Sequence, residues 1–160
     1  MLARDFARPC HVVDLHCDAI VAAHMLCAGS ESFLVMVDSS GEPHSLIRAR
    51  DILGHLLSDS LRAEPGLLSL TGPFAEAHVV RALAGKRVGD WLCGHGTALA
   101  VVAPKTPLIQ VLLLLLRTDS PGVVVAEREE EGTRIHGVIS AQLLLGRMER
   151  TLLTAPGEPY

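Results

Sequence analysis

Two short polar clusters stand where helices are expected to begin, and their residue types could bind a ligand. Arg48 and Asp51 lie three residues apart, as Gly137 and Ser140 do. A guanidinium can hold a phosphate, and a carboxylate can accept hydrogen bonds from hydroxyl groups. The same residues have an ordinary structural interpretation, because Asp51 can pair with Arg48 or Arg50 and Ser140 can cap a helix. The sequence leaves both interpretations open.

Eight histidines and four cysteines raise the alternative of a metal site or a nucleophilic thiol. The closest clusters are His16-Cys17 and Cys93-x-His95. Neither has the paired spacing of a structural zinc site, and no Cys–His catalytic arrangement can be identified. We therefore expect no metal and no catalysis. A metal-dependent enzyme or metal carrier stays a third hypothesis, which requires these side chains to converge in space.

The polar clusters belong to a unit that occurs twice. Residues 33–53 read FLVMVDSSGEPHSLIRARDIL, and residues 123–145 read VVVAEREEEGTRIHGVISAQLLL. Each copy has an apolar run, a polar turn, a second short apolar strand and an apolar helical pattern, and Ser45 superposes on Gly137. Two copies of one unit predict a pseudo-twofold module with two related clefts between its halves.

Periodicity predicts a strand, a helix, two strands and a second helix in each copy. In the first copy we expect strands at His11–Leu15, Phe33–Val37 and His44–Ile47, and helices from Asp18 to about Cys27 and over Arg48–Leu57. In the second copy we expect strands at Leu99–Val102, Val123–Ala126 and Ile135–Ile139, a helix from Pro107 capped by Thr106, and a last helix from Ala141.

The segments around the two copies are expected to be simpler. MLARDFARP is a short lead-in that Pro9 keeps from continuing as a regular helix, Pro73–Ala84 is a further helix, and Arg128–Thr133 is a turn. These patterns divide the chain into residues 1–57, the first repeat; 58–87, a linker with one helix; 88–150, the second repeat; and 151–160, a flexible tail.

Composition excludes several classes of function. The residues are 49% hydrophobic and only 3% aromatic, so a sizeable core must be aliphatic, and the formal net charge of −4 gives no reason to expect nucleic acid. The longest apolar run, Val111–Leu116, is far shorter than the roughly 18–20 residues that cross a bilayer. We expect no secretory signal, because Arg4, Asp5 and Arg8 interrupt the N-terminal apolar stretch. We expect a cytoplasmic protein without disulfides, bound neither to membrane nor to nucleic acid.

The stretches GTRIHGVISAQLLLGRM and EPHSLIRARDILGHL resemble cystathionine-β-synthase-type (CBS) domains. The signature of that family is apolar-Gly-apolar-apolar-Thr/Ser-x-x-Asp leading into a helix, and VAPKTPLIQVLLLL is similar to its opening strand and first helix. The resemblance covers roughly residues 9–57 and 88–150. It implies an α+β fold of two tandem β-α-β-β-α CBS repeats, related by pseudo-twofold symmetry, with small sheets packed on helices.

The resemblance also implies a ligand and a set of positions that hold it. CBS pairs bind adenosine-containing ligands such as AMP, ATP or S-adenosylmethionine in the cleft between repeats, and often associate as flat dimers. In such a site the Asp accepts the ribose hydroxyls, the Thr or Ser lies beside the phosphate, and small apolar residues of the first strand hold adenine. The positions carried over to this chain are Asp51, Arg48, Ser140, Gly137, His136, Thr106 and Val101.

Neither copy has the complete signature. The first copy has Asp51 but has Arg48 in place of Thr or Ser and Ser45 in place of Gly. The second copy has Gly137 and Ser140, but the Asp position is Leu143. Loss of that carboxylate removes two hydrogen bonds worth about 0.5–1.5 kcal/mol each. We therefore expect the Asp51 site to be the better one, with Arg48 as a phosphate partner.

We accordingly expect a regulatory module that senses an adenine nucleotide and requires no cofactor. It would act as a homodimer through an unknown effector protein, with the ligand biasing the relative angle of the two copies. The rival hypothesis is a protein–protein interaction module whose degenerate nucleotide sites bind no small molecule. The incomplete signatures favour the rival, and the Asp51 site favours the sensor.

Overall fold

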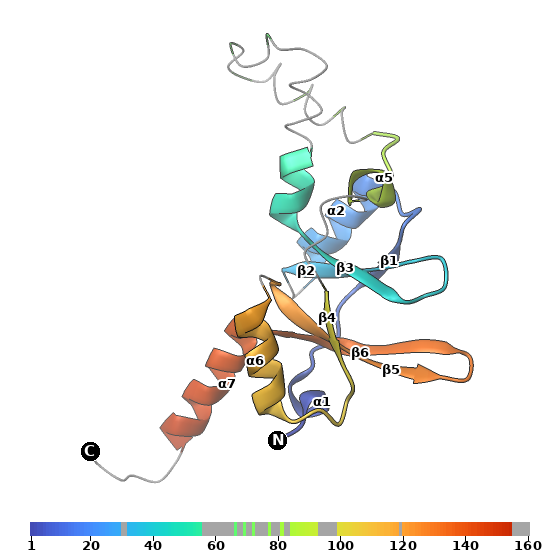
Figure 1. Cartoon of the computed structure of the whole chain (residues 1–160). Helices are drawn as coiled ribbons and strands as arrows, with labels where there is room; N and C mark the ends of the chain where they lie inside the picture. Colours follow the sequence, from blue (N-terminus) through green and yellow to red (C-terminus); the bar gives the residue numbers. More distant parts are fainter. Residues whose placement is uncertain are drawn as a thin grey trace. The chain divides into compact units, whose positions relative to one another are not determined.

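The computed structural model describes residues 1–29, 32–55, 84–92, 99–118 and 120–154, with the single positions 66, 69, 72, 77 and 81 (Figure 1). The chain divides into two compact units. One unit is Cys10–Gly96, and the other joins Met1–Pro9 to Thr97–Tyr160. Most of the expected helix at Pro73–Ala84, most of the linker and the last residues of the tail lie outside the described residues.

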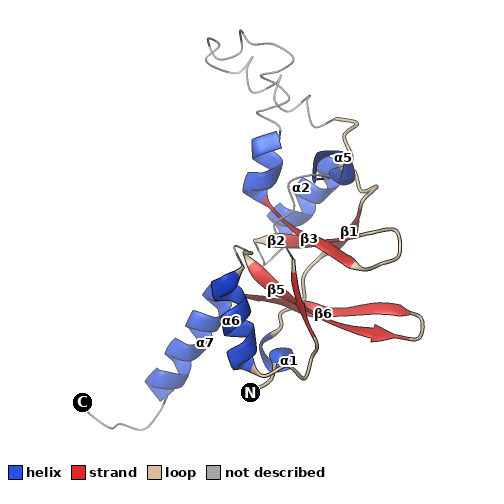
Figure 2. Ribbon diagram, viewed as in Figure 1, coloured by secondary structure: helices blue, strands red, loops and turns tan. Residues whose placement is uncertain are grey.

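The unit that contains the first repeat has a three-stranded mixed sheet. Strand β2 is central, pairs in parallel with β1 and pairs antiparallel with β3. Helices precede and follow this hairpin in the chain. Figure 2 shows the helices in blue and the strands in red. The elements are β1 (Val12–Asp14), α2 (Ala19–Ala28), β2 (Phe33–Val37), β3 (Pro43–Arg48), a helix over residues 49–55 and α5 (Val88–Leu92).

The unit that contains the second repeat has the same order. Strand β5 is central, between the parallel β4 and the antiparallel β6. The elements are α1 (Ala3–Phe6), β4 (Ala100–Val102), α6 (Leu108–Arg117), β5 (Gly122–Glu129), β6 (Gly132–Ser140) and α7 (Ala141–Thr154). The expected α+β fold with two β-α-β-β-α repeats is confirmed.

The first helix of each repeat begins differently. Asp18 caps α2 as expected, because its carboxylate accepts from the Ile20 N–H at 2.8 Å. The expected cap of α6 by Thr106 is wrong: Pro107 is the N-cap, and no side chain caps this helix. Thr106 instead closes the turn before it, since its N–H donates to the carbonyl of Ala103 at 3.0 Å.

The two hairpins differ in length. The first turns tightly after β2, where the Asp38 carboxylate accepts from the Ser40 hydroxyl and from the Ser40 and Glu42 N–H groups. These hydrogen bonds, that of the Ser40 hydroxyl above all, hold the pKa of Asp38 below its usual value. The second hairpin continues in register to Glu129 and Gly132, so the turn expected over Arg128–Thr133 is mostly paired strand.

Both hairpins carry a β-bulge at the same place. Val125 pairs with Gly137 while Ala126 pairs with Ile135, which leaves His136 as the extra residue. In the first repeat Met36 pairs with Ser45 while Val37 pairs with Pro43, which leaves His44 as the extra residue. The two repeats therefore share the same irregularity of the backbone.

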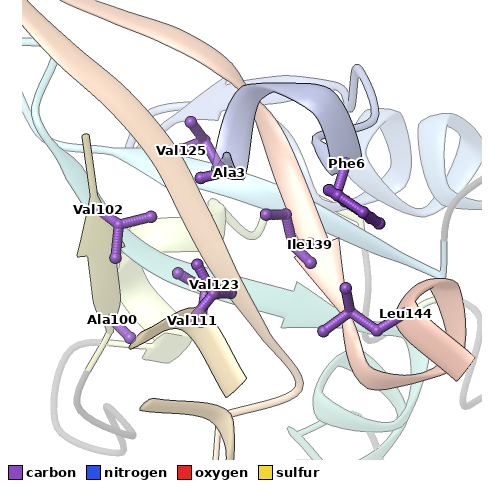
Figure 3. Close-up of a cluster of buried hydrophobic side chains, with 9 residues drawn as sticks. All are labelled: Ala3, Phe6, Ala100, Val102, Val111, Val123, Val125, Ile139 and Leu144. Carbon is purple, nitrogen blue, oxygen red and sulfur yellow. The ribbon is translucent and has the colours of Figure 1, made fainter. Parts of the chain in front are cut away.

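Each unit has its own aliphatic core on the helical side of its sheet. In the second-repeat unit, Val111 of α6 and Leu144 of α7 are fully buried against alternate residues of the sheet (Figure 3). That core comprises Ala3, Phe6, Ala100, Val102, Val111, Val123, Val125, Ile139 and Leu144. The core of the other unit comprises Val13, Ala19, Ala22, Leu34, Met36, Ile47, Ile52 and Val88.

A short helix docks on each repeat through the same backbone hydrogen bonds. The Ala3 and Arg4 N–H groups of α1 donate to the carbonyls of Thr106 and Pro104 at 2.8 and 3.0 Å. Correspondingly, the N–H groups of Val88 and Gly89 in α5 donate to the carbonyls of Cys17 and Leu15, both at 2.9 Å. The lead-in is thus a repeated element, and it packs with the second repeat although it precedes the first in sequence.

The chain that follows α1 crosses β6 at Gly137. Arg8 and Val138 exchange two backbone hydrogen bonds, at 3.1 and 2.9 Å, as an isolated antiparallel bridge. Gly137 lies beneath this crossing with φ +146°, and a Cβ atom there would collide with the Arg8 carbonyl. Only glycine meets both requirements.

No helix in the described part of the chain is long and apolar enough to span a membrane.

Gly137→Ala should lower the free energy of unfolding by roughly 1–3 kcal/mol, because it combines an unfavourable φ with the collision at Arg8. Chemical denaturation measures the change. Gly146→Ala is the matched control: Gly146 lies inside α7 with nothing within 4 Å of an added Cβ, so this variant should be neutral or stabilised. Equal stabilities of the two variants would contradict the role of Gly137.

Cys17 should alkylate with a pH midpoint above that of the unfolded chain. Partial burial, followed by the nearby carboxylates of Asp14 and Asp18, raises the pKa of the Cys17 thiol. Because the neutral thiol is favoured in the fold, the thiolate forms at higher pH. Iodoacetamide labelling with mass spectrometry, in folded and urea-unfolded protein, measures both midpoints, and exposed Cys27 monitors reagent access. A folded midpoint at or below the unfolded one would contradict this account.

Candidate functional site

The clearest candidate site is the start of the helix that follows β3. Arg48 is the last residue of β3, and Asp51 is the third residue of the helix. The Asp51 carboxylate accepts from the Arg48 backbone N–H at 2.9 Å. It also receives both arms of the Arg48 guanidinium, with Nε–Oδ2 at 3.0 Å and Nη2–Oδ1 at 3.1 Å. The two side chains are 33% and 24% exposed, so solvent screens this pair only in part.

The corresponding helix of the second repeat, α7, starts with a different contact. Ser140 ends β6, and its hydroxyl accepts from the Leu143 N–H at 3.2 Å. Ser140 therefore caps the helix, as the structural interpretation of this residue predicted. Leu143 occupies the position of Asp51 and offers no acceptor.

The two helix starts contain the two halves of one capping box. In a complete box the first residue caps the third helical N–H, and an acidic or amide side chain at the third position accepts from the N–H of the first residue. The second repeat keeps the first half in Ser140, and the first repeat keeps the second half in Asp51. The Asp51 carboxylate is a charged acceptor for hydroxyl groups of a ligand, whereas Ser140 keeps one neutral acceptor position and its O–H donor.

The glycine position of the signature differs between repeats for a structural reason. Gly137 is needed beneath the backbone of Arg8. Ser45, its counterpart, is 8% exposed, and its hydroxyl has no hydrogen-bond partner among the described residues. Gly137 is therefore explained by packing alone.

Arg134 and His136 lie on β6 just before Gly137. Arg134 is exposed, and its guanidinium lies 3.6 Å from the Glu129 carboxylate. His136 is the extra residue of the bulge, and its side chain is only 28% exposed. Its Nε2 lies 3.7 Å from the Glu127 carboxylate, too far for a hydrogen bond, and has no hydrogen-bond partner within the described residues.

Val101 and Thr106 lie apart from the signature residues of their own repeat. Val101 is a half-exposed residue of the edge strand β4, and β5 separates it from β6, which carries Gly137 and Ser140. The carbonyl of Thr106 accepts from Ala3. The structure thus brings Arg48 and Asp51 into contact in the first repeat, and it aligns His136, Gly137 and Ser140 along β6 in the second.

No metal centre is found in the described parts of the chain, where no three His, Cys, Asp or Glu side chains gather around one point. Cys17 instead donates to the carbonyl of Asp18, and the nearby His16 ring lies 3.5 Å from the Arg87 guanidinium. Cys93 and His95 lie outside the described residues.

Sequence reasoning missed two segments that dock on the repeats. Met1–Arg8 docks on the second repeat, and the segment around α5 docks on the first. A signal was present, since Ala3-Arg4-Asp5-Phe6 and Val88-Gly89-Asp90-Trp91 share a small or apolar residue, an Asp and an aromatic residue in the same order. The match is short, and it lies outside residues 33–53 and 123–145, in which the repeat was found.

Comparison with solved structures gives matches over nearly the whole chain. A CBS domain-containing protein of unknown function from Kribbella flavida is 27% identical with a TM-score of 0.73, over 92% of this chain and 99% of that one. The CBS-pair protein CBSX2 from Arabidopsis thaliana is 20% identical with a TM-score of 0.67, over 96% and 98%; its complex with AMP also matches, with a TM-score of 0.61. The CBS domain pair of MJ0100, in complex with 5′-methylthioadenosine and S-adenosylmethionine, is 15% identical with a TM-score of 0.64, over 94% and 98%.

No family model and no curated protein matches the sequence. The family is instead visible in the three-dimensional structure. Each unit repeats one order of strands and helices, down to a bulge in the hairpin and a short docked helix. Solved CBS pairs have the same fold over almost their full length. The chain therefore has the fold of a tandem pair of CBS domains.

Proposed function

We propose that this CBS pair is a regulatory, non-catalytic module that binds an adenosine-containing ligand through Arg48 and Asp51 of the first repeat. The observation that carries the proposal is the half-buried Asp51 carboxylate, which has a guanidinium beside it. Asp51 stands at the signature position whose carboxylate accepts the ribose hydroxyls in the CBS family. The ligand classes are AMP, ATP and S-adenosylmethionine. CBSX2 and MJ0100, which share the fold, were each solved with an adenosine-containing ligand.

The second repeat is the weaker candidate. Leu143 provides no acceptor for ribose hydroxyls, and the Ser140 hydroxyl already accepts from the Leu143 N–H. Gly137 is covered by the backbone of Arg8. A ligand in this repeat would lose the carboxylate hydrogen bonds without a replacement.

A ligand-free interaction module is the second candidate, and one observation favours it. Each signature side chain that the chain retains already has an intramolecular use: Asp51 holds Arg48, and Ser140 caps α7. In that case the signature would persist only because helix starts need caps. Ligand binding decides between the two candidates.

The output of either module would pass through a second copy or an effector protein in the cytoplasm. In the second-repeat unit, α6 and α7 expose large apolar side chains, including Ile109 at 64%, Leu116 at 83% and Leu145 at 68%. Such faces support self-association as a homodimer. A ligand would then act by shifting the population of arrangements.

AMP at about 1 mM should raise the melting temperature by several degrees if its Kd is about 10 μM, because that excess contributes about 2.7 kcal/mol. ATP and S-adenosylmethionine complete the thermal-shift panel. Asp51→Asn should abolish the ligand-dependent increment, whereas Leu143→Ala, at the matching position of the other repeat, should keep it. The increment is compared within each variant, because Asp51→Asn also weakens the contact with Arg48. No increment with any ligand would favour the interaction module.

Leu143→Asp should create a second nucleotide site, because it places a carboxylate acceptor at the position that matches Asp51. The same change completes the capping box around Ser140. Titration calorimetry with AMP should then show a higher stoichiometry than the parent chain. Leu143→Asn is the control, because it is similar in size but lacks the charge. A folded Leu143→Asp variant with unchanged stoichiometry would contradict the assignment of this position.

A further inference from the structure

The Arg48–Asp51 pair engages both oxygens of the carboxylate. Asp51 Oδ2 accepts from both the backbone N–H and Nε of Arg48, and Oδ1 accepts from Nη2. The two parallel side-chain contacts form the fork-to-fork arrangement that makes arginine–carboxylate pairs strong and directional. The first repeat therefore holds a guanidinium on the atoms that the proposed function assigns to the ligand.

This arrangement conflicts with direct binding of a ribose. Each carboxylate oxygen has about two acceptor positions, and both positions on Oδ2 are filled by Arg48. A ribose diol needs one acceptor position on each oxygen in good geometry. The Arg48 side chain must therefore leave Asp51 before both hydroxyls can bind.

We infer that ligand binding at the first repeat is an exchange of partners, an inference that rests on the proposed function. The ribose takes the Asp51 carboxylate, and the displaced Arg48 guanidinium takes a phosphate of the same ligand. A phosphate replaces the lost two-armed contact between the guanidinium and the carboxylate with an equivalent charge-assisted contact. An uncharged nucleoside offers the guanidinium no anion in exchange for the Asp51 carboxylate, so Arg48 selects nucleotides over adenosine and 5′-methylthioadenosine.

The second repeat supplies the substitution that tests this exchange. Ser140 stands where Arg48 stands in the first repeat, and its hydroxyl caps the helix. Arg48→Ser therefore removes the guanidinium and introduces a side chain that the same helix start accepts elsewhere in this chain. Asp51 keeps the backbone N–H of residue 48 as a partner and is released from the side chain.

Titration calorimetry of the full chain with AMP, adenosine and 5′-methylthioadenosine measures the selectivity. The parent chain should bind AMP about tenfold or more tightly than adenosine, since tenfold is the effect of one modest charged contact. In Arg48→Ser the adenosine affinity should rise severalfold, because Asp51 is released from the guanidinium. The preference for AMP over adenosine should fall to near unity. Thermal unfolding of Arg48→Ser verifies that the variant is folded.

Two results would overturn the exchange while leaving the proposed function in place. One is equal affinity of the parent chain for AMP and adenosine; the other is an unchanged preference for AMP in Arg48→Ser. Absence of binding by every ligand to both proteins would instead overturn the proposed function, and the exchange with it. The two failures are therefore distinguishable.

Discussion

The start of the helix after each sheet imposes the constraint on which this fold and its proposed function both depend. The first N–H groups of a helix have no partner within the helix and must find acceptors. Asp51 supplies an acceptor in one repeat and Ser140 in the other. Asp51 and Ser140 also stand at the signature positions. Their capping role alone is therefore enough to explain why these two residues are present.

The division of the capping box makes the two repeats chemically unequal. One helix start has a charged acceptor held by its own arginine, and the other has an uncharged hydroxyl that caps its helix. In the second repeat, Gly137 meets a further requirement, because the backbone of Arg8 crosses directly over it. A pseudo-symmetric architecture thus contains one helix start with a paired carboxylate and one with a capping hydroxyl.

The sequence predicted those parts of the fold that local chemistry determines. Phe33–Val37 is a strand with the expected bounds, and Asp18 caps its helix, because an apolar run and a carboxylate each act within a few residues. Thr106 was misassigned because its turn is fixed by α1, which is distant in sequence. The inward side chain of His136 depends on a bulge that periodicity does not reveal. At the site, the residue types were predictable, but the two-armed contact between Arg48 and Asp51 required coordinates.

The stoichiometry of AMP bound to the unmodified chain tests the central claim most directly. Equilibrium dialysis at saturating AMP measures it independently of stability and of any substitution. One nucleotide per chain is the result expected if the Asp51 carboxylate supports binding and Leu143 prevents it. Two nucleotides per chain would contradict the inequality of the repeats, and none would contradict the assignment of this CBS pair as a nucleotide sensor.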